Sequence, residues 1–212
     1  MRLKALIVSI KGIKLSRREE VLFLKEKPWG VILFKRNLKS KHQIKKLISK
    51  IKKLTKNPLF PVLIDEEGES VSRLSNLITH NISSRLIGNL YHQDKNTCIK
   101  LLDHYIFSLS KTLSSLGINT NTMPVLDVLR NNTNKIIGSR SFSKNQNVVK
   151  SLGELTIKLM HSYKICSVIK HIPGHGASTV DSHKQMPSVP LNVKKLNEID
   201  FYPFKSTKAL LG

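Results

Sequence analysis

The stretch ICSVIKHIPGHGASTVDSH, residues 165–183, predicts the fold of this chain. Its first five residues are apolar or small and are typical of a buried strand. The strand ends at Lys170 and His171, and a loop with Pro173 and two glycines follows. α/β enzymes display catalytic groups at the carboxyl ends of parallel strands in this way, and titratable groups gather at functional sites. The alternative is an ordinary turn that carries surface histidines.

Similar apolar runs recur along the chain and alternate with helix-like segments. Five runs predict strands, at residues 6–10, 31–34, 59–64, 118–125 and 165–169. Helical patterns occupy residues 16–25, 44–54, 97–116, 151–163 and 194–211. Strands that alternate with helices over short connections predict a parallel sheet, either a barrel or a doubly wound fold.

Polar residues at the strand ends help to decide between these two folds. Asn37, Asp65, Asp127 and Lys170 each follow a predicted strand. In a barrel these residues would converge on one mouth, and we expect Asp127 to support that mouth rather than to touch substrate. No glycine-rich nucleotide-binding motif follows any strand. We therefore predict an α/β chain of the TIM type, a (β/α)8 barrel of which residues 1–212 form a single, incomplete domain of about five to six β/α units.

The net charge of +22 at first suggests a nucleic-acid partner. Basic residues are frequent and acidic ones absent between residues 35 and 56. Ser40 and Gln43 predict a capping box at a helix start. The apolar residues that follow recur at helical spacing, namely Ile44, Leu47, Ile48, Ile51 and Leu54. This is typical of an outer helix with solvated lysines, and no nucleic-acid-binding motif accompanies it, so we expect no nucleic-acid partner.

The cysteines and the lengths of the apolar stretches indicate the cellular compartment. Cys98 and Cys166 lack metal-ligand spacing and are interpreted as reduced, packed thiols. The apolar stretch at residues 5–10 is too short for a signal peptide, and no stretch approaches the length of a membrane span. We expect a cytoplasmic protein with no membrane partner.

Four motifs in order carry a resemblance to a known family. They are LIDEEGESVSRL at residues 63–74, GINTNTMPVLDV at 117–128, GSRSFS at 138–143 and the loop at 170–183. Together they resemble glycoside hydrolase family 3, and most of all its bacterial cytoplasmic β-N-acetylglucosaminidases of cell-wall recycling. The resemblance implies a hydrolase that removes terminal, non-reducing β-linked N-acetylglucosamine from muropeptides. It also implies a retaining mechanism, no metal and no cofactor.

The resemblance assigns roles to particular residues. It implies that Asp181 and His183 form the catalytic acid/base pair. It implies a sugar-binding pocket made of Asp65, Arg73, Arg140, Lys170 and His171. These residue types suit the task, because charged groups form strong hydrogen bonds to sugar hydroxyls and a histidine side chain titrates near pH 6.5 in water. Such a group can protonate a leaving oxygen and then accept a proton from water.

The sequence departs from the family pattern in two ways. The family usually has glycine and arginine where this chain has Glu69 and Ser70, and aspartate where it has Ser139; Glu69 is expected to strain its loop. The family's nucleophilic aspartate follows a later strand, beyond Gly212. We therefore expect a C-terminally truncated chain, because retention needs a second carboxylate about 5 Å from the acid/base group. A separate chain that supplies the missing barrel segment is one expected partner.

Three other functions remain open from the sequence. The first is an inactive, truncated remnant that still binds sugar. The second is a metal-dependent hydrolase that uses His171, His175, Asp181 and His183, which are suitable zinc ligands. Pro173 and Gly174 between the first two histidines disfavour it. The third is a basic nucleic-acid-binding protein, which rests on charge alone.

Overall fold

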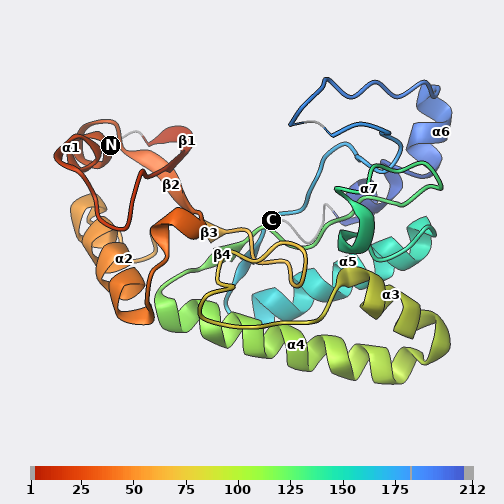
Figure 1. Ribbon diagram of the computed structural model, residues 1–212, viewed down its shortest axis with the longest axis horizontal. Coiled ribbons are helices and arrows are strands. Elements are labelled where there is room, and N and C mark those ends of the chain that lie inside the picture. The colour runs from red at the N-terminus through yellow and green to blue at the C-terminus, as the bar shows by residue number, and fades with distance from the viewer. Residues whose placement is uncertain (1–2, 182, 208–212) are drawn as a thin grey trace.

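The structure, a computed structural model, describes residues 3–181 and 183–207 as a parallel sheet with helices packed around it (Figure 1). The strands are β1 (Lys4–Ser9), β2 (Pro28–Leu33), β3 (Val62–Ile64), β4 (Thr120–Asn121) and β5 (Cys166–Ser167). They lie in chain order, and each strand pairs in parallel with the next. A doubly wound sheet reverses its strand order, whereas a barrel does not. The order therefore confirms the barrel-type fold, and the five strands of the described residues form an incomplete barrel.

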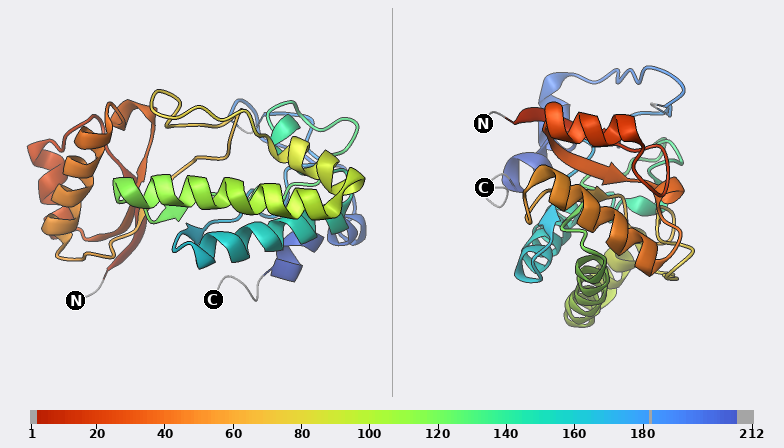
Figure 2. Two further views of the ribbon diagram at one scale, coloured as in Figure 1. Left: turned by 90° about the horizontal axis from the view of Figure 1, so that it is seen from below. Right: turned by 90° about the vertical axis from the view of Figure 1, so that its left-hand side faces the viewer.

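Helices follow most of the strands. They are α1 (Arg17–Lys25), α2 (Lys41–Thr55), α3 (Ser84–Gln93), α4 (Lys95–Leu116), α5 (Gln146–Ser162), α6 (Val193–Glu198) and α7 (Tyr202–Thr207), with 3₁₀ turns η1 (Lys35–Asn37) and η2 (Gly138–Arg140). The long α4 packs against α3 and α5, and α5 packs against α7 (Figure 2). No helix in the described ranges is long and apolar enough to cross a membrane.

Local signals set the helix starts. Ser16 and Glu19 form a complete capping box at α1. At α2, the Ser40 side chain accepts a hydrogen bond from the backbone N–H of Gln43, as predicted. The Gln43 side chain accepts from the backbone N–H of Lys39 instead of returning to Ser40, so only half of the predicted box forms. The predicted apolar face of α2 is buried, at Ile44, Leu47, Ile48 and Ile51.

The sequence pattern predicted no element at α3. Two other predictions about local structure were wrong. The helix predicted for residues 194–211 divides into α6 and α7, and the fully buried Asp200 lies between them and pairs with Arg130. Residues 208–211 lie outside the described residues. Cys98 is buried as predicted, but Cys166 is exposed, because it lies on the edge strand β5 of the described sheet.

Strand register brings three strand ends to one edge of the sheet. Ile64 of β3 is level with Asn121 of β4, and Asn121 is level with Ser167 of β5. Beyond β5, Lys170 pairs with Val125 in an isolated parallel bridge. The residues that directly follow these strands therefore emerge side by side, and they build the candidate site.

Candidate functional site

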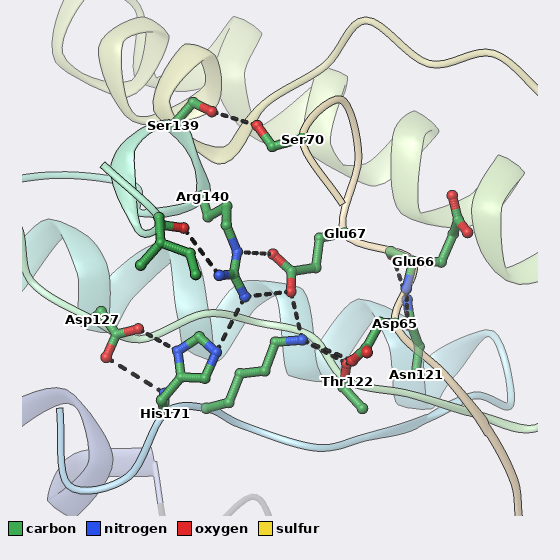
Figure 3. A network of polar contacts seen from close by, with 12 residues as sticks. Asp65, Glu66, Glu67, Ser70, Asn121, Thr122, Asp127, Ser139, Arg140 and His171 are labelled. Carbon is green, nitrogen blue, oxygen red and sulfur yellow. Dashed lines mark hydrogen bonds and ion pairs between the residues drawn. The ribbon is translucent and has the colours of Figure 1, made fainter. Parts of the chain in front are cut away.

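A network of charged side chains lies beyond the carboxyl ends of β3, β4 and β5 (Figure 3). The Lys170 ammonium contacts Asp65 Oδ1 at 3.0 Å, Glu67 Oε1 at 2.5 Å and the Thr122 hydroxyl at 2.7 Å. Arg140, from η2, donates two hydrogen bonds to the Glu67 carboxylate at 2.7 and 2.8 Å. Glu67 thus joins Arg140 to Lys170, while Asp65 pairs with Lys170 and Arg73.

Asp65 is held in its ionised form. Burial raises the pKa of this carboxyl, but the charge of Lys170 and hydrogen bonds from Thr122, Lys170 and Arg73 outweigh burial and lower the pKa to about 2. Arg73 donates to Asp65 Oδ2 at 3.1 Å, while Lys170 and Thr122 both donate to Oδ1. A carboxylate oxygen accepts about two hydrogen bonds. Oδ2 therefore retains one acceptor position, on a side chain that is 19% exposed.

His171 has a defined orientation and tautomer. Its Nδ1 lies 2.6 Å from Oδ2 of Asp127, and its Nε2 lies 3.1 Å from Nη2 of Arg140. Arginine can only donate, so Nε2 accepts and Nδ1 carries the proton that is donated to Asp127. The fully buried Asp127 also accepts from the backbone N–H of His175 at 2.6 Å. Asp127 therefore holds the His171 ring and the start of the following loop in place.

A second buried group holds the loop that carries Arg73. Glu66 is fully buried and accepts hydrogen bonds from the backbone N–H groups of Arg73 and Leu74 at 2.8 and 2.9 Å. Its other oxygen lies 2.5 Å from Nε2 of His80, whose Nδ1 contacts the Tyr105 hydroxyl. These contacts place Arg73 against Asp65.

Two departures from the family pattern meet in the structure. The hydroxyls of Ser70 and Ser139 lie 2.6 Å apart and connect the Arg73 loop to η2 (Figure 3). The strain expected at Glu69 was wrong, because Glu69 does not adopt a positive φ. The positive φ falls on Gly68, at 135°, where an added Cβ would lie 2.3 Å from the carbonyl oxygen of Ile82. Glycine is thus required one residue earlier.

The remaining predicted pair, Asp181 and His183, lies on the loop after β5. The ring Nδ1 of His183 is 2.8 Å from Oδ1 of Asp181, which also accepts the backbone N–H of His183. These backbone and side-chain hydrogen bonds lower the pKa of Asp181. The ionised Asp181 favours the tautomer with the proton on Nδ1 and leaves Nε2 available. His183 lines a cavity of about 330 Å³ together with Arg140 and His171.

The same geometry argues against the metal-dependent alternative. Nε2 of His171 faces the Arg140 guanidinium, so a cation already occupies the position that a metal would need. Within residues 3–181 and 183–207, no three His, Cys, Asp or Glu side chains are grouped to hold a metal ion.

The structure brings all five predicted sugar-pocket residues into one region. Sequence reasoning did not place Glu66, Glu67, Thr122 or His80 in the sugar pocket. Glu66 and Glu67 directly follow Asp65 in a motif that was already identified, so their position was a usable signal. For His80 there was no such signal in the sequence, because its partner Glu66 is 14 residues away and the loop between them is irregular.

Comparisons with known proteins concern the chain as a whole. The model of the glycosyl hydrolase family 3 N terminal domain matches residues 3–208. Beta-hexosaminidase A of Pseudoalteromonas piscicida is 34% identical over 82% of this chain and 30% of its own length. A beta-hexosaminidase of Stenotrophomonas maltophilia strain K279a is 28% identical over 95% of this chain and 59% of its own.

Solved structures are similar over nearly the whole chain. NagZ from Neisseria gonorrhoeae, solved in complex with N-trifluoroacetyl-D-glucosamine, superposes with a TM-score of 0.90 and 28% identity, over 98% of this chain and 61% of NagZ. A family 3 beta-N-acetylglucosaminidase from Paenibacillus sp. str. FPU-7 has a TM-score of 0.87 and 28% identity, over 97% of this chain and 38% of the Paenibacillus protein. The chain therefore spans less than two thirds of the relatives that it matches. From these matches and the shared barrel fold, the chain belongs to glycosyl hydrolase family 3.

Proposed function

We propose that this chain carries the sugar-binding half of a β-N-acetylhexosaminidase site, specific for a terminal, non-reducing β-linked N-acetylglucosamine. The observation that carries the proposal is the cluster of Asp65, Arg73, Arg140, Lys170 and His171 at one end of the sheet. The N-acylated glucosamine named with the N. gonorrhoeae NagZ structure supports the same class of ligand. Muropeptides of peptidoglycan recycling are the proposed natural substrate.

The contacts suggest how the sugar is held. Asp65 Oδ2 has an acceptor position for a sugar hydroxyl, and the Arg73 guanidinium beside it supplies donors, with 32% of its side chain exposed. Lys170 already uses its three ammonium hydrogens on Asp65, Glu67 and Thr122. Its proposed role is therefore to hold Asp65 ionised and in place.

The Asp181–His183 pair is the proposed acid/base group. With Nδ1–H directed to Asp181, Nε2 of His183 is available to protonate the glycosidic oxygen and then to accept a proton from water. The cavity that His183 shares with Arg140 and His171 supports this assignment, because it links the pair to the sugar-binding cluster.

The nucleophile needs a separate source. Retention requires a second carboxylate about 5 Å from the acid/base group. Glu67 is engaged by two cations, and Glu66 and Asp127 are fully buried and hydrogen-bonded. We place the nucleophile in a segment that corresponds to the relatives' additional length, either in the same protein or in a separate chain. Leu6 and Ile7 of β1 are 53% and 48% exposed and offer an apolar edge for it.

Binding and turnover test different parts of the proposal. N-acetylglucosamine binding to the 212-residue chain is measured by NMR titration, with Asp65→Asn as the site variant and Glu154→Gln, on the surface of α5, as the matched control. Loss of a hydrogen bond from a charged group predicts binding weaker by about tenfold or more for Asp65→Asn only. Equal binding by both variants would refute the pocket.

Turnover is measured as release of nitrophenol from 4-nitrophenyl N-acetyl-β-glucosaminide. The 212 residues are assayed alone and after fusion to the C-terminal part of a related NagZ, each with and without His183→Ala. We expect turnover only in the fusion with His183 intact. Binding without turnover in any form would instead identify an inactive sugar-binding remnant. Turnover that is insensitive to His183→Ala would refute the acid/base assignment.

A further inference from the structure

Two hollows adjoin each other at the amino ends of the strands, on the opposite side of the sheet from the candidate site. Their volumes are about 520 and 490 Å³, and Lys56 and Asn57 line both. Pro28, which begins β2, and Pro61, which precedes β3, line the first hollow. Gly117, which precedes β4, lines the second.

The first hollow is apolar and unusually exposed. Trp29 is 44% exposed, Leu24 46%, Leu3 58% and Leu59 79%, and all four line the hollow. Single exposed apolar side chains are normal on a protein surface, but a contiguous group around a cavity marks a binding surface. Trp29 is a further indication of a binding surface, because tryptophan is enriched at boundaries between an apolar phase and water.

The second hollow is basic. Lys45, Lys52, Lys53 and Lys56 line it, from the outer face and the end of α2, beside hydroxyl groups of the α4 terminus. No acidic side chain lines either hollow, and none of these four lysines takes part in an ion pair within the described residues. By contrast, Lys50 of the same helix pairs with Glu20. The lysine charges of the second hollow are therefore available to an anionic partner.

We propose that this amino-end face binds the surface of an anionic membrane. The exposed side chains of the first hollow would enter the headgroup region, namely Leu3, Leu24, Trp29 and Leu59. The lysines of the second hollow would contact the anionic lipid headgroups. An apolar group beside a basic rim is the chemistry that binds an interface of this kind. A nucleic acid would satisfy the lysines but would leave the aliphatic side chains in water.

The proposed surface lies away from the sugar-binding cluster, so membrane binding and sugar binding are compatible. It was invisible in the sequence, which gave no reason to expect a membrane partner. No run of residues is apolar enough to indicate it, because its members come from three separate segments, near residues 3, 23–29 and 54–61. A surface contact of this kind also needs no membrane-spanning helix.

The fluorescence of Trp29 provides a direct test, because it is the only tryptophan in the chain. The 212-residue chain is titrated with vesicles of phosphatidylcholine alone and of phosphatidylcholine mixed with phosphatidylglycerol, and binding is also measured by co-sedimentation. We expect a blue shift of the emission and co-sedimentation with the anionic vesicles only, both weakened by salt. Lys45→Glu/Lys52→Glu/Lys53→Glu should weaken binding by at least about tenfold. Leu59→Ser should weaken it without changing its dependence on anionic lipid.

The matched control reverses three exposed lysines elsewhere, Lys158→Glu/Lys194→Glu/Lys195→Glu on α5 and α6, with the same change in net charge. Circular dichroism confirms that each variant is folded. Equal weakening by the two triple variants would show that total charge alone acts, and would overturn the proposal. The absence of a blue shift with anionic vesicles would also overturn it, as would binding of single-stranded RNA by the same lysines without any vesicle binding.

Discussion

Replacement of Glu67 by glutamine isolates the charge at the centre of the candidate site. The Glu67 side chain is 5% exposed, and its partners Arg140 and Lys170 are 12% and 15% exposed. Glutamine keeps the size of the side chain and one oxygen acceptor. It removes the negative charge and directs an amide group toward two cations. The variant therefore tests whether Glu67 holds the network together or merely fills space.

The expected magnitude follows from what each cation retains. Removing one member of a buried ion pair costs about 3–5 kcal/mol, because it leaves a buried charge uncompensated. Lys170 keeps its contact with Asp65, while Arg140 keeps its hydrogen bonds to the carbonyl of Ile136 and to His171. We therefore expect a loss near the lower limit, about 3 kcal/mol of unfolding free energy. For a chain of this size that corresponds to a melting temperature lower by roughly 10 °C.

The assay is urea unfolding followed by far-UV circular dichroism, with Glu154→Gln as the control. Glu154 lies 4.0 Å from Lys150 on the surface of α5, and such a pair contributes about 0.5 kcal/mol or less. In the double variant Glu67→Gln/Arg140→Gln, removal of the uncompensated cation should recover at least about 1 kcal/mol relative to additivity. A loss below about 1 kcal/mol for Glu67→Gln, or additive effects in the double variant, would refute the central role of Glu67.

Three further predictions concern stability. The pKa of Asp65 is lowered to about 2 in the folded chain, so its ionised carboxylate stabilises the fold by about 2 kcal/mol above pH 4, and this stabilisation is lost as the pH falls through about 2. In urea unfolding, the Asp65→Asn variant should lack this dependence of stability on pH. Gly88→Ala places a Cβ 1.8 Å from a backbone oxygen and should destabilise by about 2 kcal/mol or more, whereas Gly12→Ala, in open space, should be nearly neutral in the same assay. Ser70→Arg/Ser139→Asp should show a favourable coupling of about 0.5 kcal/mol in a double-mutant cycle, and zero coupling would show that these side chains do not interact.

Local patterns in the sequence predict much of this molecule, because the physics behind them acts over a few residues. β-branched apolar runs identified each of the strands β1–β5, although β3, β4 and β5 are shorter than their runs. The helix starts at Ser16 and Ser40 follow from side chains that reach three residues ahead. The placement of Asp65 and Lys170 after strands was sufficient to bring them to the same edge, since parallel strands share a direction.

The tertiary structure alone decided which charges compensate each other and which surfaces remain uncovered. Glu67 joins Arg140 and Lys170 across 73 and 103 residues, and no local pattern records a pairing over that distance. Asp200, between α6 and α7, pairs with Arg130 across 70 residues, and the face around Trp29 is assembled from three segments. Ion pairs and surface hollows arise between elements, so they become visible only when packing has fixed the positions of those elements.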